Sequence, residues 1–314
     1  MSLTIGVDIG GTKVLGGVVA EDGTVITVAR RDTPATSPAE TLDRIVEVVT
    51  ELAAEHPVEA VGIGAAGWID AARSTVLYAP NLAWRYEPLR DAIARRTKLR
   101  VIVENDANVA AWAEFRFGAA KDASDSMVMY TVGTGIGGGI VLGGELVRGA
   151  NGIAAELGHT LVVSGGYPCG CGSRGCLEQY ASGKALTRFA HEAIEADPVA
   201  GASLLAAAGG DLRNVTGPMV TAAAMAGDKL AIGAFETAGF WFGQGLSDLA
   251  FIIDPEVFVV GGGVIESGDL LLAPTRRAYL DRLPQRAKLP VAEVIPASLG
   301  NMAGLVGAAD LARR

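Results

Sequence analysis

The cysteines of this chain cluster around a possible metal site. Cys169, Cys171 and Cys176 are the only three cysteines, they share one glycine-rich stretch, and His159 precedes them closely. Three thiols cannot all pair with one another, and in a cytosolic chain such a cluster favours a metal over disulfides. Structural zinc takes four Cys or His ligands in a closed tetrahedron. We therefore expect His159, Cys169, Cys171 and Cys176 to bind zinc, the alternative being reduced cysteines beside a core histidine.

Two glutamates flank the predicted zinc site. Glu156 lies just before His159, and Glu178 lies just after Cys176. A closed site of three cysteines and one histidine leaves no position for a catalytic water, so the zinc would hold a loop. Folding this loop around the metal would bring both carboxylates toward one place. Carboxylates that converge in this way can accept hydrogen bonds from sugar hydroxyls.

Two glycine-threonine turns could surround phosphate groups. Gly10–Lys13 follows an apolar segment that ends near Asp8, and Gly133–Gly139 follows a second apolar segment. Backbone N–H groups in such turns can approach phosphate oxygens closely, and a nearby carboxylate can hold Mg2+. One such turn alone is weak evidence, but a matching pair and a third glycine run favour a nucleotide site. The predicted ATP and Mg2+ residues are Asp8, Gly10, Gly11, Thr12, Lys13, Gly133, Thr134, Gly135, Gly137, Gly138, Gly139, Gly261, Gly262 and Gly263.

Neither turn has the spacing of a Walker A loop, and neither opens directly into a helix as a dinucleotide-binding loop does. This weakens a reading as an NAD-dependent enzyme.

Asp106 follows Asn105 at a predicted strand-to-helix junction. The carboxyl ends of strands are where open α/β sheets present ligands, and a helix N-terminus favours negative charge. Asp106 is therefore a candidate catalytic carboxylate. The alternative is an ordinary helix N-cap.

The elements that must position these residues alternate between strands and helices. Apolar β-like segments are expected at 3–9, 14–20, 25–30, 60–65, 101–104, 127–132, 140–142 and 257–260. Helices are expected after Ser37, at 88–97, 107–117 and 300–312, and through most of the chain beyond residue 180. The strand–glycine turn–strand pattern occurs twice, which predicts duplicated lobes. The predicted lobes are residues 1–118 with the C-terminal helix at about 300–314, and residues 119–299, which carry the zinc loop.

Composition narrows the class of protein. The chain has 314 residues, of which half are hydrophobic and 42 are glycine, so it is long enough for two lobes of an α/β protein. Its net charge of −9 with scattered basic residues argues against a nucleic-acid surface. Its first residues lack the pattern of a signal peptide, and its apolar stretches are too short to span a membrane. We expect a cytoplasmic protein that binds neither nucleic acid nor membrane.

Together these motifs resemble the ROK family of sugar kinases and sugar-responsive repressors, and most closely its bacterial glucokinases. The resemblance extends over almost the whole chain. It rests on Asp8–Lys13, Glu104–Asn108, Gly133–Gly139, Glu156–His159 and the cysteine motif through Glu178.

The resemblance implies an α/β protein with the two-lobed actin-like ATPase/hexokinase fold, built from duplicated ribonuclease H-like lobes with the sugar in the cleft between them. It implies ATP-dependent phosphorylation of glucose at its 6-hydroxyl, with Asp106 as catalytic base and a dimeric or tetrameric assembly. The residues that would contact the sugar are Gly67, Asn105, Asp106, Glu156, His159 and Glu178, with Asn81 a weaker candidate. An Asp106 of ordinary acidity would suffice as a base, so we expect no strongly raised pKa.

Other interpretations stay open at this point. N-acetylmannosamine, mannose or fructose could replace glucose as acceptor, and polyphosphate could replace ATP as donor. A sugar-sensing regulator without catalysis is a further alternative. ROK repressors carry a DNA-binding segment ahead of the sugar-binding part, and here the first phosphate-loop strand is expected to begin at Leu3.

Overall fold

The computed structural model describes residues 2–34, 36–79, 82–286 and 288–314. The chain divides into two compact units, each described here by itself. The first comprises residues 1–129, 138–155 and 297–314, and the second residues 130–137 and 156–296. None of the described helices is both long and apolar enough to span a membrane.

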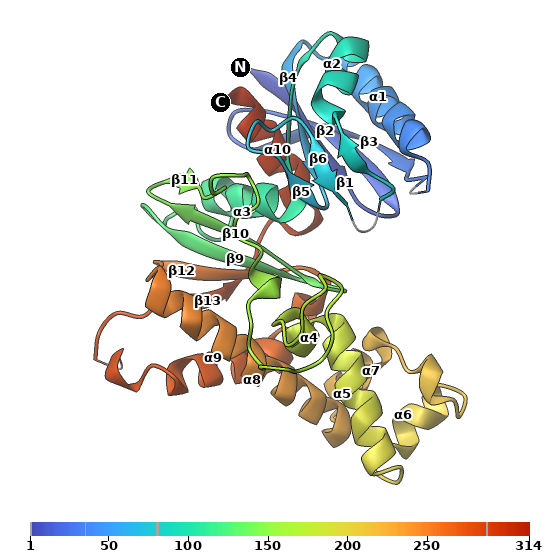
Figure 1. Cartoon of the computed structure of the whole chain (residues 1–314), viewed down its shortest axis with the longest axis vertical. Coiled ribbons are helices and arrows are strands. Elements are labelled where there is room, and N and C mark those ends of the chain that lie inside the picture. Colours follow the sequence, from blue (N-terminus) through green and yellow to red (C-terminus); the bar gives the residue numbers. More distant parts are fainter. Residues whose placement is uncertain (1, 35, 80–81, 287) are drawn as a thin grey trace. The chain divides into compact units, whose positions relative to one another are not determined.

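The first unit is built on a five-stranded sheet with the order β3-β2-β1-β4-β8 (Figure 1). β1 pairs antiparallel with β2 and parallel with β4, and β4 pairs parallel with β8. The strands are β1 (Leu3–Ile9), β2 (Lys13–Val19), β3 (Val25–Asp32), β4 (Val58–Ala65) and β8 (Arg100–Asn105). The helices are α1 (Pro38–Glu55), α2 (Leu89–Thr97), α3 (Asp106–Phe117) and α10 (Ala303–Arg313), which follows a 3-10 turn at Gly300–Met302. A small sheet contains β5 (Trp68–Ile69), β6 (Val76–Tyr78) and β7 (Arg85–Glu87).

Glycines let α10 pack directly on this sheet. A Cβ atom at Gly6 would lie 1.7 Å from the carbonyl oxygen of Leu305, and one at Gly62 would lie 1.8 Å from that of Ala308. The two glycines are register partners on β1 and β4, so they form one flat patch under the helix. α1 covers the opposite face, where a Cβ at Gly16 would meet Val48. The core of the sheet is thereby enclosed by helices on both faces.

A second five-stranded sheet has the order β11-β10-β9-β12-β13. Its strands are β9 (Met127–Val132), β10 (Ile136–Leu142), β11 (Glu145–Leu146), β12 (Val257–Gly261) and β13 (Glu293–Pro296). The division between the units passes within β9 and β10. As in the first sheet, a hairpin of the first strands lies beside a parallel pair, here β12 and β13. This repetition agrees with the predicted duplication.

Helices make up most of the second unit. They are α4 (Glu178–Ala181), α5 (Gly183–Ala196), α6 (Ala202–Ala207), α7 (Gly217–Met225), α8 (Lys229–Ile252) and α9 (Asp269–Asp281). Short 3-10 turns occur at Leu157–His159, Leu212–Asn214, Gly263–Ser267 and Pro284–Arg286. The helical character expected beyond residue 180 is confirmed.

The predicted strands differ from the observed ones in three places. β10 begins at Ile136, so Gly137, Gly138 and Gly139 lie inside a strand and not in the expected turn. Gly139 is needed there because a Cβ atom would lie 2.4 Å from that of Ala111 on α3. The short strands β11 and β13 of the second sheet and the small sheet β5-β6-β7 were not predicted, since they have only two to four residues each.

Candidate functional site

The predicted zinc ligands converge in the second unit. One ligand atom from each of His159, Cys169, Cys171 and Cys176 lies within 4.8 Å of all the others. Nδ1 of His159 is 3.6 Å from Sγ of Cys169, and Sγ of Cys171 is 3.7 Å from Sγ of Cys176. A tetrahedral zinc ion with ordinary bond lengths would separate two sulfurs by about 3.8 Å and a sulfur from a nitrogen by about 3.5 Å. The residues present therefore fit zinc.

The cysteine loop is shaped by its backbone. The N–H of Cys169 donates to Ser173 O (2.9 Å), and that of Gly172 donates to Cys169 O (3.0 Å). These bonds form a tight turn that presents Cys169 and Cys171 from one side. Leu161 and Cys176 form an isolated antiparallel bridge, which returns the chain toward His159.

Glu156 and Glu178 both border the zinc cluster, as predicted. Nε2 of His159 is 4.0 Å from a carboxylate oxygen of Glu156, while its Nδ1 is turned toward Cys169. Oε1 of Glu178 is 4.0 Å from Sγ of Cys169, and its Oε2 accepts a hydrogen bond from the N–H of Ile136 (3.0 Å). Glu178 thus connects the cluster to the turn between β9 and β10.

A cavity of about 700 Å3 lies next to that turn, wholly within the second unit. Its volume is in the range of small-molecule sites. The turn is tied to α5, because the N–H of Gly183 donates to Gly133 O (2.8 Å). The lining residues are Gly133, Thr134, Gly183, Lys184, Leu186, Thr187, Gly217, Pro218, Thr221, Ala222, Met225, Gly263, Val264 and Glu266.

The chemistry of this cavity suits a nucleotide. The first residues of α5 and α7 both line it, and helix N-termini favour phosphate oxygens through their N–H groups and dipole. Lys184 adds a positive charge at the start of α5. Leu186, Met225 and Val264 provide an apolar wall that a purine base can contact.

Sequence reasoning found only part of this lining. Gly133, Thr134 and Gly263 were predicted, whereas the contributions of α5 and α7 were missed. The signal that could have indicated α5 is Ser182-Gly183-Lys184, in which Ser182 caps the helix by accepting from the N–H of Ala185 (3.2 Å). α7 offers no comparable charged residue at its start.

The remaining predicted glycines do not line the cavity. Gly135 contacts Glu178, since a Cβ atom there would lie 2.3 Å from its Oε2. Gly261 ends β12, and Gly262 has a φ of +88° with its Cα against the backbone of Val132. Gly10, Gly11, Thr12 and Lys13 form the β1–β2 turn of the first unit, closed by the N–H of Gly10 donating to Lys13 O (2.9 Å).

In the first unit, Asn105 and not Asp106 is the N-cap of α3. The Asn105 Oδ1 accepts from the N–H of Asn108 (3.0 Å), and its Nδ2 donates to the carbonyl of Gly67 (3.0 Å). Asp106 is the first residue of the helix, where its Oδ1 accepts from the N–H of Ala107 (2.9 Å). The N-cap alternative for Asp106 is therefore wrong.

Gly67 is held close to Asn105 by its own backbone. Its φ is +123°, and a Cβ atom would lie 2.2 Å from the carbonyl oxygen of Tyr78. Only glycine fits this position. Asn81 lies outside the described residues.

Asp8 and Asp106 repel one another in the first unit. Burial raises the pKa of Asp8 to about 6, and the charge of Asp106 adds to this while Lys13 opposes it. Burial also raises the pKa of Asp106, although the hydrogen bond from the N–H of Ala107 lowers it in part. The expectation of no strongly raised pKa for Asp106 is wrong. The folded protein shields this carboxylate from water, which disfavours its charged form.

The chain has known relatives along its whole length. The ROK family model matches residues 4–314. A glucokinase of Streptomyces coelicolor is 48% identical over the whole chain and 98% of its own length, and a glucokinase of Thermotoga maritima is 36% identical over 98% and 96%. A crystal structure of a ROK family glucokinase from Streptomyces griseus with glucose and AMPPNP is 49% identical, covers 99% of each chain and has a TM-score of 0.87.

The fold is therefore the predicted actin-like ATPase/hexokinase fold, and the chain belongs to the ROK family.

Proposed function

We propose that this protein is an ATP-dependent glucokinase, which transfers the γ-phosphoryl group of ATP to the 6-hydroxyl of glucose. The observation that carries this proposal is its full-length similarity to the Streptomyces griseus glucokinase, whose crystal structure contains glucose and AMPPNP. The cavity of the second unit and the carboxylates of the first supply groups for both substrates.

The nucleotide would place its base against the apolar wall of the cavity and its phosphates near Gly133 and Thr134. Lys184 and the N-terminus of α5 would offset part of the phosphate charge. Gly10–Lys13 and the glycines predicted from sequence would complete the phosphate contacts. Asp8 would hold Mg2+, which when bound neutralises the phosphates.

Asp106 would accept the proton of the attacking sugar hydroxyl. Its raised pKa makes it a stronger base than an exposed aspartate once it is ionised, which helps as the oxygen–phosphorus bond forms. Phosphoryl transfer needs mainly positioning and charge stabilisation, so one oriented carboxylate is enough. Asn105, fixed by Asn108 and Gly67, would orient the same hydroxyl region.

Glu156, His159 and Glu178 would bind the remaining sugar hydroxyls. With Nδ1 of His159 on zinc, its Nε2 carries the proton and can donate to a hydroxyl. The zinc would then fix the ring orientation of a sugar-binding histidine, together with the loop that carries Glu178. The metal site would support sugar binding without contacting the reacting atoms. Its ligands would be His159, Cys169, Cys171 and Cys176.

A coupled assay of ADP release tests the proposal. We expect turnover with ATP and glucose, and weaker turnover with mannose, fructose or N-acetylmannosamine. Faster turnover with another acceptor would reassign the sugar, and faster turnover with polyphosphate would reassign the donor. Glucose binding without any ADP release would instead support a sugar-sensing regulator.

A further inference from the structure

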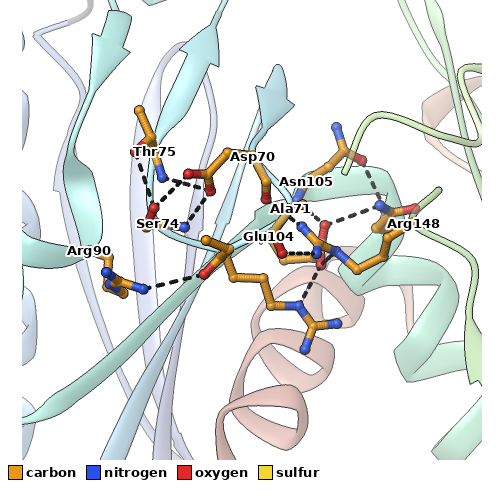
Figure 2. Close-up of polar contacts among 11 residues, drawn as sticks. Asp70, Ala71, Ser74, Thr75, Arg90, Glu104, Asn105 and Arg148 are labelled. Atoms are coloured by element: carbon orange, nitrogen blue, oxygen red, sulfur yellow. Dashed lines mark hydrogen bonds and ion pairs between the residues drawn. The ribbon is translucent and has the colours of Figure 1, made fainter. Parts of the chain in front are cut away.

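The carboxylate of Glu104, at the end of β8, is fully buried and has four partners (Figure 2). Its Oε1 accepts from the N–H of Asn105 (2.9 Å) and from Nδ2 of Asn108 (3.1 Å). Its Oε2 is 3.0 Å from Nε of Arg73 and 2.5 Å from Nε of Arg148. One oxygen therefore holds the start of α3, and the other holds two arginines.

The two arginines come from different segments of the first unit. Arg73 lies in the turn after β5 and has a left-handed backbone with a φ of +54°, held by its carbonyl accepting from the N–H of Val103 (3.0 Å). Arg148 follows β11, and its terminal nitrogens donate to the carbonyls of Ala71 (2.8 Å) and Asp70 (2.9 Å), as Figure 2 shows.

The turn at residues 70–75, which includes Arg73 and accepts hydrogen bonds from Arg148, is fixed by further hydrogen bonds. The carboxylate of Asp70 accepts from the N–H groups of Ser74 (2.7 Å) and Thr75 (3.1 Å) and from the Ser74 hydroxyl (2.6 Å). These hydrogen bonds lower the pKa of Asp70. A left-handed non-glycine residue persists only where its surroundings fix it, and such positions gather at functional sites.

A buried carboxylate is costly unless it is paired and hydrogen-bonded. Here the buried carboxylate is stabilised by contacts with three segments: the β8–α3 junction with Asn105 and Asp106, the turn that follows Gly67 and β5, and the segment that leads from Arg148 to Glu156. All three end in residues that the proposed function places around the sugar. No catalytic atom of Glu104 needs to reach the substrate for it to affect turnover.

We propose that Glu104 is a positioning residue for the kinase reaction, with Arg73 and Arg148 as its clamps. It sets the orientation of Asn105 and Asp106 relative to Gly67 and fixes the segment that precedes Glu156. This inference rests on the proposed function, because the role of Asp106 as base defines what is positioned.

Glu104→Gln tests this role. The amide keeps an oxygen for Asn105 and Asn108 but turns an N–H2 group toward the two arginines, so only the clamp is lost. A displacement of the base by about 1 Å can lower turnover by about a hundredfold. We expect kcat to fall by about tenfold to a hundredfold, while the KM for ATP changes by less than about threefold, because none of the contacts of Glu104 involves a residue that lines the nucleotide cavity.

Glu114→Gln is the matched control. Glu114 is an equally buried glutamate on α3, and its carboxylate accepts from the N–H groups of Ala119 (2.7 Å), Ser298 (3.0 Å) and Leu299 (2.7 Å), away from Asp106. We expect this variant to lose stability but keep kcat within about threefold. Equal losses of kcat in both glutamate variants would overturn the proposal, since the effect would then be general destabilisation.

A second pair of variants, at Arg148, tests the same proposal if Glu104→Gln does not fold. Arg148→Lys preserves the charge beside Glu104, and Arg148→Met removes it. We expect Met to lose about tenfold or more of kcat and Lys to lose less, because Lys keeps the charge beside Glu104 but not the guanidinium donors to the carbonyls of Ala71 and Asp70; no difference between them would overturn the clamp. Asp106→Asn is measured in parallel, because near-normal turnover in that variant would refute the proposed function and not the clamp alone.

Discussion

Replacing Asp8 by asparagine should make the ligand-free protein more stable, although it removes a residue proposed to hold Mg2+. The carboxylate of Asp8 is partly buried near Asp106, and a Cβ atom at Gly304 of α10 would lie 2.9 Å from its carboxylate carbon. Its pKa of about 6 exceeds the ordinary value of 3.8. The folded protein therefore binds the Asp8 proton more tightly than the unfolded chain does.

The sign and size of the effect follow from this difference. Stability falls as the pH rises from about 4 to about 6 and stays at its lower level above that, because the folded state must then ionise a buried carboxylate. At about 1.36 kcal/mol for each pH unit, the total cost is about 3 kcal/mol at pH 8. Asparagine removes this cost, and its advantage should grow by about 1.4 kcal/mol between pH 5 and pH 8.

Urea unfolding of wild type and Asp8→Asn at several pH values, without nucleotide or Mg2+, measures this growth. Asp22→Asn is a control that should lower the stability at neutral pH. Hydrogen bonds from Thr24 lower the pKa of Asp22, so its ionised form is favoured in the folded state. Since Asp106 contributes to the shift at Asp8, an Asp106→Asn background should reduce the gain. If the difference in the free energy of unfolding between wild type and Asp8→Asn does not change from pH 5 to 8, Asp8 does not have a raised pKa in the folded protein.

Three further predictions concern the fold, the zinc and the nucleotide. Gly62→Ala places a Cβ atom 1.8 Å from the carbonyl oxygen of Ala308, so the free energy of unfolding should fall by about 3 kcal/mol or more in thermal melts. Gly233→Ala, on α8 where no atom is near, should be neutral or stabilising, and equal losses would contradict the close packing. Metal analysis should find one zinc ion per chain, and removing it with a chelator should raise the KM for glucose before it raises the KM for ATP. An unchanged KM for glucose would mean that the metal stabilises the fold without supporting sugar binding. Lys184→Met should raise the KM for ATP several-fold with little change for glucose, and the reverse pattern would place the nucleotide elsewhere.

The convergence of the Cys/His cluster could be predicted because its four residues lie close together in the sequence. Cys169, Cys171 and Cys176 share one loop, and His159 is the nearest histidine along the chain. The strand-to-helix junction at Asn105 and Asp106 could be predicted for the same reason. In each case the short spacing fixes which side chains can meet.

Contacts between distant segments could not be predicted in this way. The clamp on Glu104 joins residues 31 and 44 positions away, and the bond from Ile136 to Glu178 joins residues 42 positions apart. The raised pKa of Asp106 depends on burial by elements that no local pattern identifies. Likewise, Gly137–Gly139 resemble a phosphate turn in sequence, and only the packing of Gly139 against Ala111 shows why a strand needs glycine there.

Comparison of the wild type with Asp106→Ala tests whether Asp106 is the base of a glucose-phosphorylating reaction. Glucose-dependent ADP release is measured for wild type and Asp106→Ala, with glucose binding and zinc content measured on the same samples. We expect the wild type to turn over glucose and the variant to lose about a thousandfold or more in kcat while it still binds glucose and zinc. Near-normal turnover by Asp106→Ala would mean that Asp106 is not the base, and no glucose-dependent ADP release by the wild type would mean that the protein is not a glucokinase.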